Sequence, residues 1–78
     1  MSIYGLFSAT GNKVIVEQTG RDYRVYRRTV AAGASGWGES ENHIRFALPA
    51  TLFPGRAVLY VIDAEGRETP TGMEIKIR

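Results

Sequence analysis

The chain has 78 residues, of which 44% are hydrophobic and 23% are charged, and its net charge is +2. These values are those of an ordinary globular protein, so they exclude wholesale disorder, and the length excludes a multidomain machine. We therefore expect a single domain over residues 1–78. The absence of cysteine excludes disulfides and thiolate metal sites, which leaves oligomerisation or docking as the means of stabilising so small a core.

The first half of the chain predicts three strands separated by turns. Residues 2–7 and 13–18 are short apolar segments with Gly11-Asn12 between them, and a turn at 19–22 leads into a third predicted strand over 23–31. The glycine-rich residues 32–42 follow, and we expect them to form a long loop or arm.

The second half predicts three more strands. Residues 43–48 and 72–78 alternate apolar and polar side chains, which is typical of strands with one buried and one wet face. Residues 57–63 begin with an unbroken apolar run, which predicts a strand covered on both faces. Between the first and last of these, residues 48–53 allow at most one helical turn, because Pro49 interrupts them and Pro54 follows them.

Turn signals every eight to twelve residues and a period of two predict an all-β fold. The fold class that we expect is a small antiparallel β-sandwich of about six strands. No stretch reaches the roughly 20 apolar residues of a membrane helix, so we expect no membrane partner.

The excess positive charge lies in one segment, because residues 21–28 contain four arginines and one aspartate. On a strand, Arg24, Tyr26 and Arg28 share one face, while Tyr23 lies on the other. Tyrosine and arginine are enriched at protein interfaces, and they also suit phosphates and stacked bases. A third interpretation is a solvated strand whose arginines cover tyrosines and pair with Glu17, Glu39 or Glu41.

Trp37 is the only tryptophan, and it lies between two glycines. Such a ring is either a plug over the end of the β core or an anchor for a partner. The candidate partner-binding residues are therefore Trp37, Arg24, Tyr26, Arg28 and Tyr23.

Side chains for catalysis are scarce. His43 is the only histidine, and it is interpreted as an exposed strand residue without a serine or cysteine partner. Glu39 and Glu41 are interpreted as solubilising residues of the loop. We expect no catalytic site, no metal and no cofactor, and hence no enzyme.

Residues 52–66 resemble a segment of fibronectin type III and bacterial Ig-like domains. Leu52-Phe53-Pro54-Gly55 is similar to the turn before strand F of those families, and Asp63-Ala64-Glu65-Gly66 is similar to their F–G loop. Val58 departs from the family pattern, which commonly has a tyrosine there. The resemblance implies an Ig-like or fibronectin type III-like sandwich that is trimmed, since the chain is shorter than a standard one.

The N-terminal half resembles small virion proteins of tailed bacteriophages. The resemblance rests on Tyr4-Gly5-Leu6, on Gly11-Asn12-Lys13-Val14, and on Arg21 and Arg24 before a strand. It implies a tail-, fibre- or capsid-associated structural protein, located in the virion, that binds other virion proteins or copies of itself.

The function that we expect is therefore a non-enzymatic structural or interaction module. The alternatives are a nucleic-acid-binding small β-barrel, with Lys13, Arg45 and Lys76 as the basic residues of adjoining strands, and a small cytoplasmic inhibitor of a host protein. Retention on single-stranded nucleic acid at low salt would favour the first alternative.

Overall fold

The computed structural model describes residues 1–77, with Pro70 described by its backbone alone. These residues form seven strands and no helix, which confirms the all-β prediction. The strands are β1 (Ser2–Tyr4), β2 (Lys13–Thr19), β3 (Val25–Val30), β4 (Gly38–Glu39), β5 (His43–Arg45), β6 (Gly55–Ile62) and β7 (Glu68–Ile77).

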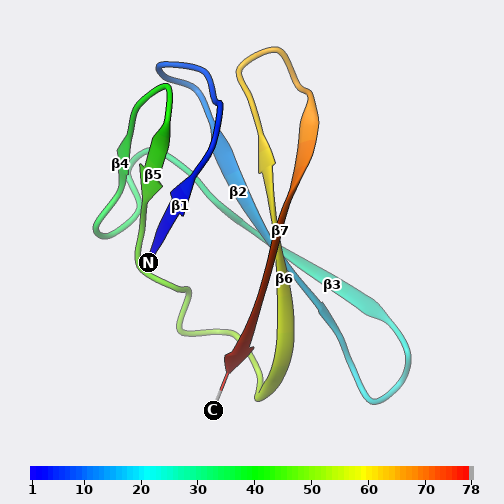
Figure 1. The fold of residues 1–78 in the computed structure, drawn as a ribbon. Coiled ribbons are helices and arrows are strands. Elements are labelled where there is room, and N and C mark those ends of the chain that lie inside the picture. Colours follow the sequence, from blue (N-terminus) through cyan, green and yellow to red (C-terminus); the bar gives the residue numbers. More distant parts are fainter. Residues whose placement is uncertain (78) are drawn as a thin grey trace.

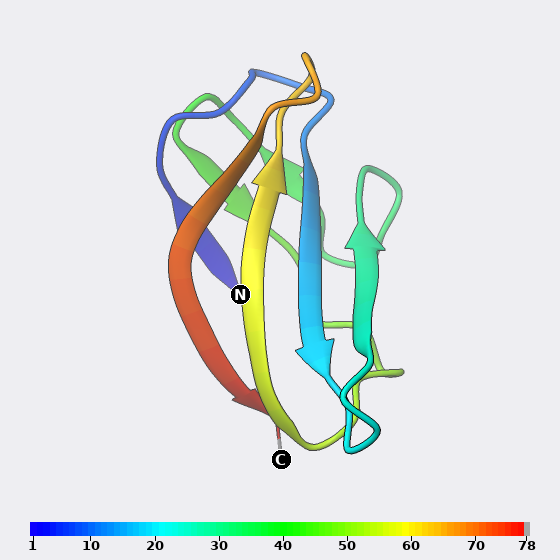
Figure 2. The ribbon, with the colours of Figure 1, turned by 90° about the vertical axis from the view of Figure 1, so that its right-hand side faces the viewer.

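The strands pack as two antiparallel sheets (Figures 1 and 2). The smaller sheet has the order β1-β5-β4 and the larger has the order β3-β2-β6-β7. The small sheet covers only part of the large one, because its strands have two or three residues while β6 and β7 have eight and ten. The hairpin between β2 and β3 therefore extends beyond the covered region (Figure 1).

The strand order is that of an immunoglobulin-type sandwich. Such sandwiches place strands A-B-E-D in one sheet and C, F and G in the other, to which variable-type domains add C′. With β1 taken as strand B, the two sheets have the orders B-E-D and C′-C-F-G. Strand β6 then occupies the position of strand F, as the resemblance implied, and within residues 1–77 no strand lies at the position of strand A beside β1.

The core lies between the sheets and is built by alternation along the strands. Every second residue of β6 is buried, starting at Ala57, and β2 contributes Val14 and Val16 with no exposed surface. The small sheet contributes Ile3 and Ile44, which are cross-strand partners. Phe46, which follows β5, is 1% exposed and is the largest fully buried side chain of the described residues.

Several predicted boundaries were wrong, and the largest error lies in the segment 32–42. Gly38 and Glu39 pair with Arg45 and Ile44, so this segment contains a short strand that sequence alone did not predict. Residues 48–53 form no helix and contain only a turn at 50–51, in agreement with the expectation of at most one helical turn there. Strand β7 begins at residue 68 rather than 72 because it resumes pairing with β6 beyond a bulge.

The prediction that residues 57–62 are covered on both faces was also wrong. Val58, Tyr60 and Ile62 point away from the core and are only half-buried. Their cover is a set of polar side chains rather than a second layer: Arg27 pairs with Glu17 at 3.1 Å and with Glu68, and its guanidinium lies 5.6 Å from the centre of the Tyr60 ring. A long arginine can shield apolar surface in this way and remain hydrated.

Candidate interaction surface

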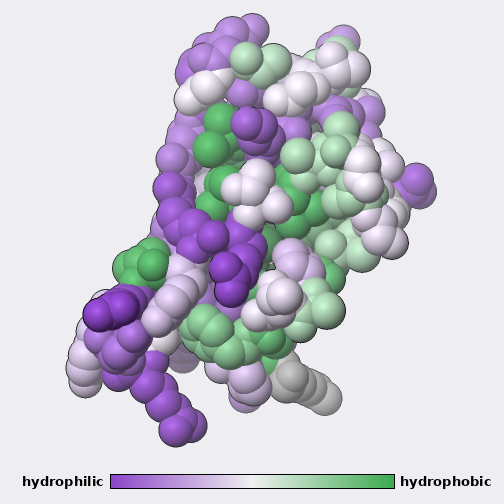
Figure 3. Space-filling view, turned by 180° about the vertical axis from the view of Figure 1, so that it is seen from behind, coloured by the Kyte–Doolittle hydropathy of each residue, from purple (hydrophilic) through white to green (hydrophobic). Residues whose placement is uncertain are grey.

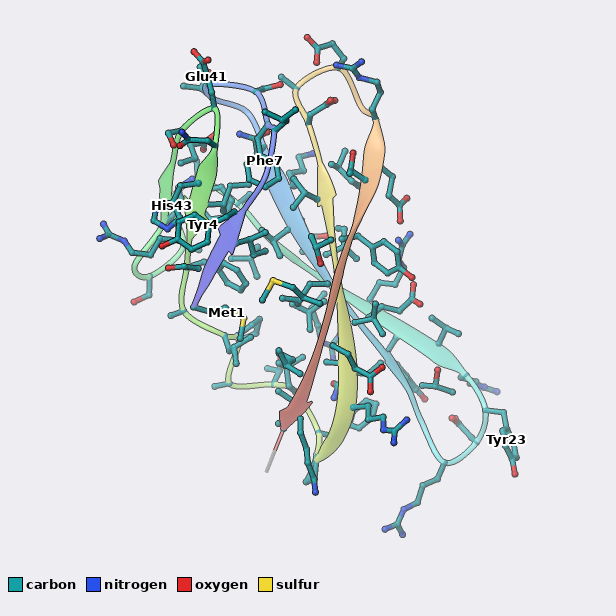
Figure 4. All side chains as sticks on the ribbon, in the orientation of Figure 1. Met1, Tyr4, Phe7, Tyr23, Glu41 and His43 are labelled. Carbon is teal, nitrogen blue, oxygen red and sulfur yellow. The ribbon has the colours of Figure 1, made fainter. Side chains whose placement is uncertain are left out.

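The turn between β2 and β3 presents a tyrosine to solvent. The Gly20 N–H donates to the Arg24 carbonyl at 2.8 Å, and the Tyr23 N–H donates to the Gly20 carbonyl at 3.0 Å. Within this closed turn Tyr23 has a φ of 62°, and it is the only non-glycine residue with positive φ among residues 1–77. Its side chain is 90% exposed, and Figure 4 shows it pointing away from the rest of the molecule. We call residues 20–24 the hairpin tip.

The carboxylate of Asp22 holds the hairpin tip in this shape. It accepts hydrogen bonds from the Arg24 N–H at 3.1 Å and from the Tyr26 hydroxyl at 2.9 Å, and it lies 3.7 Å from Arg24 Nε. The Arg24 N–H, and after it the Tyr26 hydroxyl, hold the pKa of the Asp22 carboxyl below its usual value. The same hydrogen bond raises the pKa of the Tyr26 hydroxyl, because it favours the protonated phenol.

We expect the hairpin tip to keep its structure below the pH at which an ordinary aspartate becomes protonated. Because the folded pKa of Asp22 is lowered, its contribution is complete above the unfolded value of about 3.9 and is lost as pH falls through the folded value. An NMR titration of the Arg24 amide should therefore give a midpoint below that value. The D22N variant should remove the titration, and a midpoint above about 4 would contradict this account.

Replacing Tyr23 with glycine should stabilise the fold. A non-glycine residue in the left-handed region costs about 1 kcal/mol, and a side chain that is 90% exposed has little packing to offset the cost. Glycine also gains backbone freedom in the unfolded chain, so the expected gain in the free energy of unfolding is at most about 1 kcal/mol. Urea denaturation of Y23G and of a Y23A control tests this, since alanine relieves no strain; a Y23G variant less stable than Y23A would refute it.

Exposed apolar and basic side chains lie at the hairpin tip and directly after it. Val25 is 58% exposed, and the side chain of Arg24 is 80% exposed. Figure 3 shows hydrophilic side chains concentrated at this end of the molecule, with apolar surface beside them. A hollow of about 540 Å³ opens here, and its lining residues are Thr19, Gly20, Arg21, Asp22, Tyr26, Phe53 and Pro54.

Tyr26 supports this surface from beneath. It lies opposite Gln18 in the β2–β3 register, and its ring meets that of Phe53 edge to face at 5.6 Å. Gln18 is 3% exposed, and its side-chain amide donates to the Phe53 carbonyl and accepts from the Phe53 N–H. Tyr26 is therefore a packed residue with its hydroxyl bound, and it positions the tip rather than presenting a free ring.

The structure separates the predicted arginine face from other basic residues. Arg28 lies on the same side of β3 as Tyr26 and is exposed, whereas Arg27, on the other side, is bound by two glutamates. Lys13 lies at the far end of β2 from the hairpin tip, and Arg45 belongs to the small sheet. Lys76 lies on β7, opposite Arg56 in the strand register and at the edge of the large sheet that is farthest from β3. Lys13, Arg45 and Lys76 are therefore not gathered beside Arg24 and Arg28.

Trp37 lies far from the hairpin tip, against the core. It is half-buried beside the core cluster, and its indole N–H donates to Glu39 Oε2 at 2.6 Å. The other oxygen of Glu39 accepts from the backbone and side-chain N–H groups of Asn12, at 3.1 and 3.0 Å. In this place the ring acts as a plug, and we call Ser8, Asn12, Trp37 and Glu39 the polar cluster.

The interpretation of Glu39 as a solubilising loop residue was wrong. Glu39 is the cross-strand partner of buried Ile44, so it points toward the inside of the sandwich, while Glu41 is exposed in the following turn. Sequence carried no signal for this, because a two-residue strand, Gly38–Glu39, has no periodicity to read.

The small sheet has an exposed aromatic surface that the sequence did not identify. Tyr4 is 78% exposed and stacks on His43, with ring centroids 4.7 Å apart and planes at 13°. His43 is therefore half-buried rather than exposed, and its Nε2 has no hydrogen-bond partner within residues 1–77. Leu6, just after β1, is 93% exposed. Because side chains alternate along a strand and Ile3 is buried, Tyr4 would be expected to face outward. No feature of the sequence marks Leu6 as exposed.

Within residues 1–77, no three metal-ligating side chains gather at one place. Over the same residues, no helix is long and apolar enough to cross a bilayer. Comparison with protein-family models, with curated proteins and with solved structures finds no match to this chain.

Proposed function

We propose that this chain is a non-enzymatic structural module that binds another protein through the surface around its hairpin tip. We call the exposed end of this hairpin the tip surface: it has Tyr23 and Arg24 in the turn, with Val25 on one face of β3 and Arg28 on the other. The observation that carries the proposal is Tyr23, which is held at positive φ and is 90% exposed. A strained, solvent-facing aromatic residue has no use in the isolated fold, and strain of this kind concentrates at functional sites.

The chemistry of the tip surface indicates the kind of partner. Tyrosine and arginine, with tryptophan, are enriched among the residues that contribute most of the binding energy at protein interfaces. Within residues 1–77, Arg21 and Arg28 make no ion pair, whereas Arg24 and Arg27 do. The complementary surface is therefore apolar with an acidic rim, which would increase the rate of association at low salt.

We propose further that the partner belongs to a bacteriophage virion and that the chain is one of its structural components. The support is the resemblance of Tyr4-Gly5-Leu6 and Gly11-Asn12-Lys13-Val14 to small tail-associated proteins. A small sandwich with a rigid, tightly hydrogen-bonded tip is suited to packing against larger virion proteins.

The test is incorporation into particles. Mass spectrometry of purified particles should find the wild-type protein, and particles assembled with Y23A or R28E should contain it at a level reduced at least about tenfold, as loss of 1.4 kcal/mol of binding energy predicts. K13E is the matched control, because Lys13 lies at the opposite end of β2 and the charge change is the same. Particles that lack the wild-type protein would remove the virion proposal, and full incorporation of Y23A and R28E would remove the role of the tip surface.

The same variants also test the alternative that the partner is a nucleic acid. Retention of the wild-type protein on single-stranded DNA, with an affinity that falls steeply with salt and is lost in R28E, would replace the protein partner with a phosphate backbone. Binding of the folded monomer to a purified host enzyme would instead support the inhibitor alternative.

A further inference from the structure

Three of the four sheet edges carry features that prevent pairing with another chain. Strand β3 carries exposed arginines, and β4 has only two residues. Strand β7 carries Pro70, charged residues and a bulge opposite Leu59. Short edges, charges, prolines and bulges are the usual protections of an edge strand.

The fourth edge, at β1, has none of these protections apart from the strand's short length. Residues 1–7 contain no charged side chain and no proline. Main-chain pairing with the segment of β5 continues on both sides of β1, since the Phe46 N–H donates to the Met1 carbonyl at 3.0 Å and the Gly5 N–H donates to the Asn42 carbonyl at 3.2 Å. Hydrogen bonds to this neighbouring segment therefore continue past both ends of β1, with a bend in the chain at Gly5.

The hydrogen-bond pattern determines which groups the free edge presents. In an antiparallel pair, alternate residues point their N–H and C=O groups toward the partner strand. Met1 and Gly5 point toward β5, so Ser2, Tyr4 and Leu6 point their main-chain groups away from it. None of these three N–H groups donates to an acceptor within residues 1–77.

The side chains along this edge are apolar and exposed. Tyr4 is 78% exposed, Leu6 is 93% exposed and Met1 is 40% exposed. Figure 4 shows Tyr4 stacked on His43 at the outer face of the small sheet, with Met1 at the beginning of the strand. An apolar strand with unpaired main-chain groups is a template for strand addition.

We propose that a second copy of this chain adds to the free edge of β1. The two β1 strands would run antiparallel about a two-fold axis near Tyr4, so that the two three-stranded sheets become one six-stranded sheet across the dimer. In this register Tyr4 of one copy lies opposite Tyr4 of the other, and Ser2 lies opposite Leu6. The contact satisfies about six main-chain groups on each copy.

A second copy is the occupant that the charge pattern favours. When two identical strands pair about a two-fold axis, each side chain lies opposite the same residue or another residue of the same strand. A strand rich in one charge would therefore place like charges opposite each other, which is unfavourable. Residues 1–7 carry no charged side chain, so their side chains meet no such repulsion, whereas β3 paired with itself would oppose arginine with arginine. The stability gained by pairing is also greatest at this edge, because β1 has only three residues and belongs to the smaller of the two sheets of a small domain.

Sedimentation equilibrium of the full chain, from micromolar to near-millimolar concentration, tests the proposal. The wild-type protein should show a monomer–dimer equilibrium. Y4K and L6K should each raise the Kd of the dimer at least about tenfold, because each variant places two lysines, one from each copy, in the contact. L6K removes almost no contact in the monomer, so thermal unfolding should show that it folds normally. Y23K is the matched control, since it puts the same charge in place of another highly exposed tyrosine, away from β1, and should leave the Kd unchanged.

Amide exchange adds a main-chain readout. The Tyr4 N–H should exchange more slowly as the wild-type concentration rises, and this dependence should vanish in L6K. A protein that stays monomeric at every concentration would overturn the proposal, as would a dimer that Y23K dissociates and Y4K does not. The proposal does not depend on the tip surface, because Y23A can lose its partner while the β1 dimer remains intact.

Discussion

Replacing Asn12 with aspartate should lower the free energy of unfolding by about 3–5 kcal/mol at pH 7. The Asn12 side chain is 1% exposed, and its amide nitrogen donates to the Ser8 carbonyl at 2.6 Å and to Glu39 Oε1 at 3.0 Å. In the variant a carboxylate oxygen takes the place of this nitrogen and faces two other oxygens. The Ser8 N–H, which donates to Asn12 Oδ1 at 3.0 Å, still serves one oxygen of the new carboxylate, but the other oxygen has no donor and lies beside a second carboxylate. A buried charge in such a place is among the most destabilising local changes that a fold can experience.

The N12D variant should recover stability as the pH is lowered. Two carboxylates at one site raise the folded pKa of one of them above its unfolded value, so protonation favours the folded state and stability is regained as pH falls through that raised pKa. Urea denaturation at pH 7 and pH 5 measures the difference. N42D is the control, because Asn42 is exposed and the same change there should cost less than about 0.5 kcal/mol. Equal losses in N12D and N42D would show that the polar cluster does not hold the two sheets together.

Replacing Gln18 with leucine should cost about 2–4 kcal/mol. The Gln18 side chain donates to the Phe53 carbonyl at 2.8 Å and accepts from the Phe53 N–H at 3.3 Å. Leucine has a similar size and leaves both main-chain groups without a partner, and each such group costs about 1–3 kcal/mol when buried. Urea denaturation measures the loss of stability, and a loss below about 1 kcal/mol would mean that water replaces both hydrogen bonds.

The Q18L variant should also alter the hairpin tip. Phe53 packs edge to face on Tyr26, whose hydroxyl holds Asp22, so release of Phe53 should change the ring signals of Tyr26 in NMR spectra. E17Q is the matched control: Glu17 is the neighbour of Gln18 on the opposite face of β2, and its carboxylate binds Arg27 rather than the 50–54 segment. A Tyr26 signal that is unchanged in Q18L would show that the tip is independent of that segment.

Side-chain alternation was enough to predict most of the fold. The period of two at Ile44 and Phe46, and at Met73 and Ile75, placed apolar residues toward the core, and the structure buries the first pair fully and the second partly. The turns at Gly11-Asn12 and at 63–66 also lie where glycine indicated them. Local chemistry sufficed there because a turn and an alternating face depend on neighbours in sequence.

The candidate site was predicted only in part. Tyr23 and Arg24 are exposed at one place, as a partner surface would need, but Tyr26 is packed and Arg28 lies farther along the strand. Trp37 lies in a different region, with its indole N–H held by Glu39. A strand pattern tells which residues share a face, yet it cannot tell whether that face extends beyond the opposing sheet.

The sequence by itself determined that this chain is a small all-β domain with a basic, tyrosine-rich segment and no cysteine. Only the tertiary structure decided that Glu39 faces inward onto Asn12, that Tyr23 takes a left-handed conformation at an exposed tip, and that β1 has an unprotected edge. The physical reason is the range of the interactions. Alternation and turn preference act over a few residues, whereas the partner of a carboxylate or the neighbour of an edge strand is set by segments that meet only when the two sheets pack.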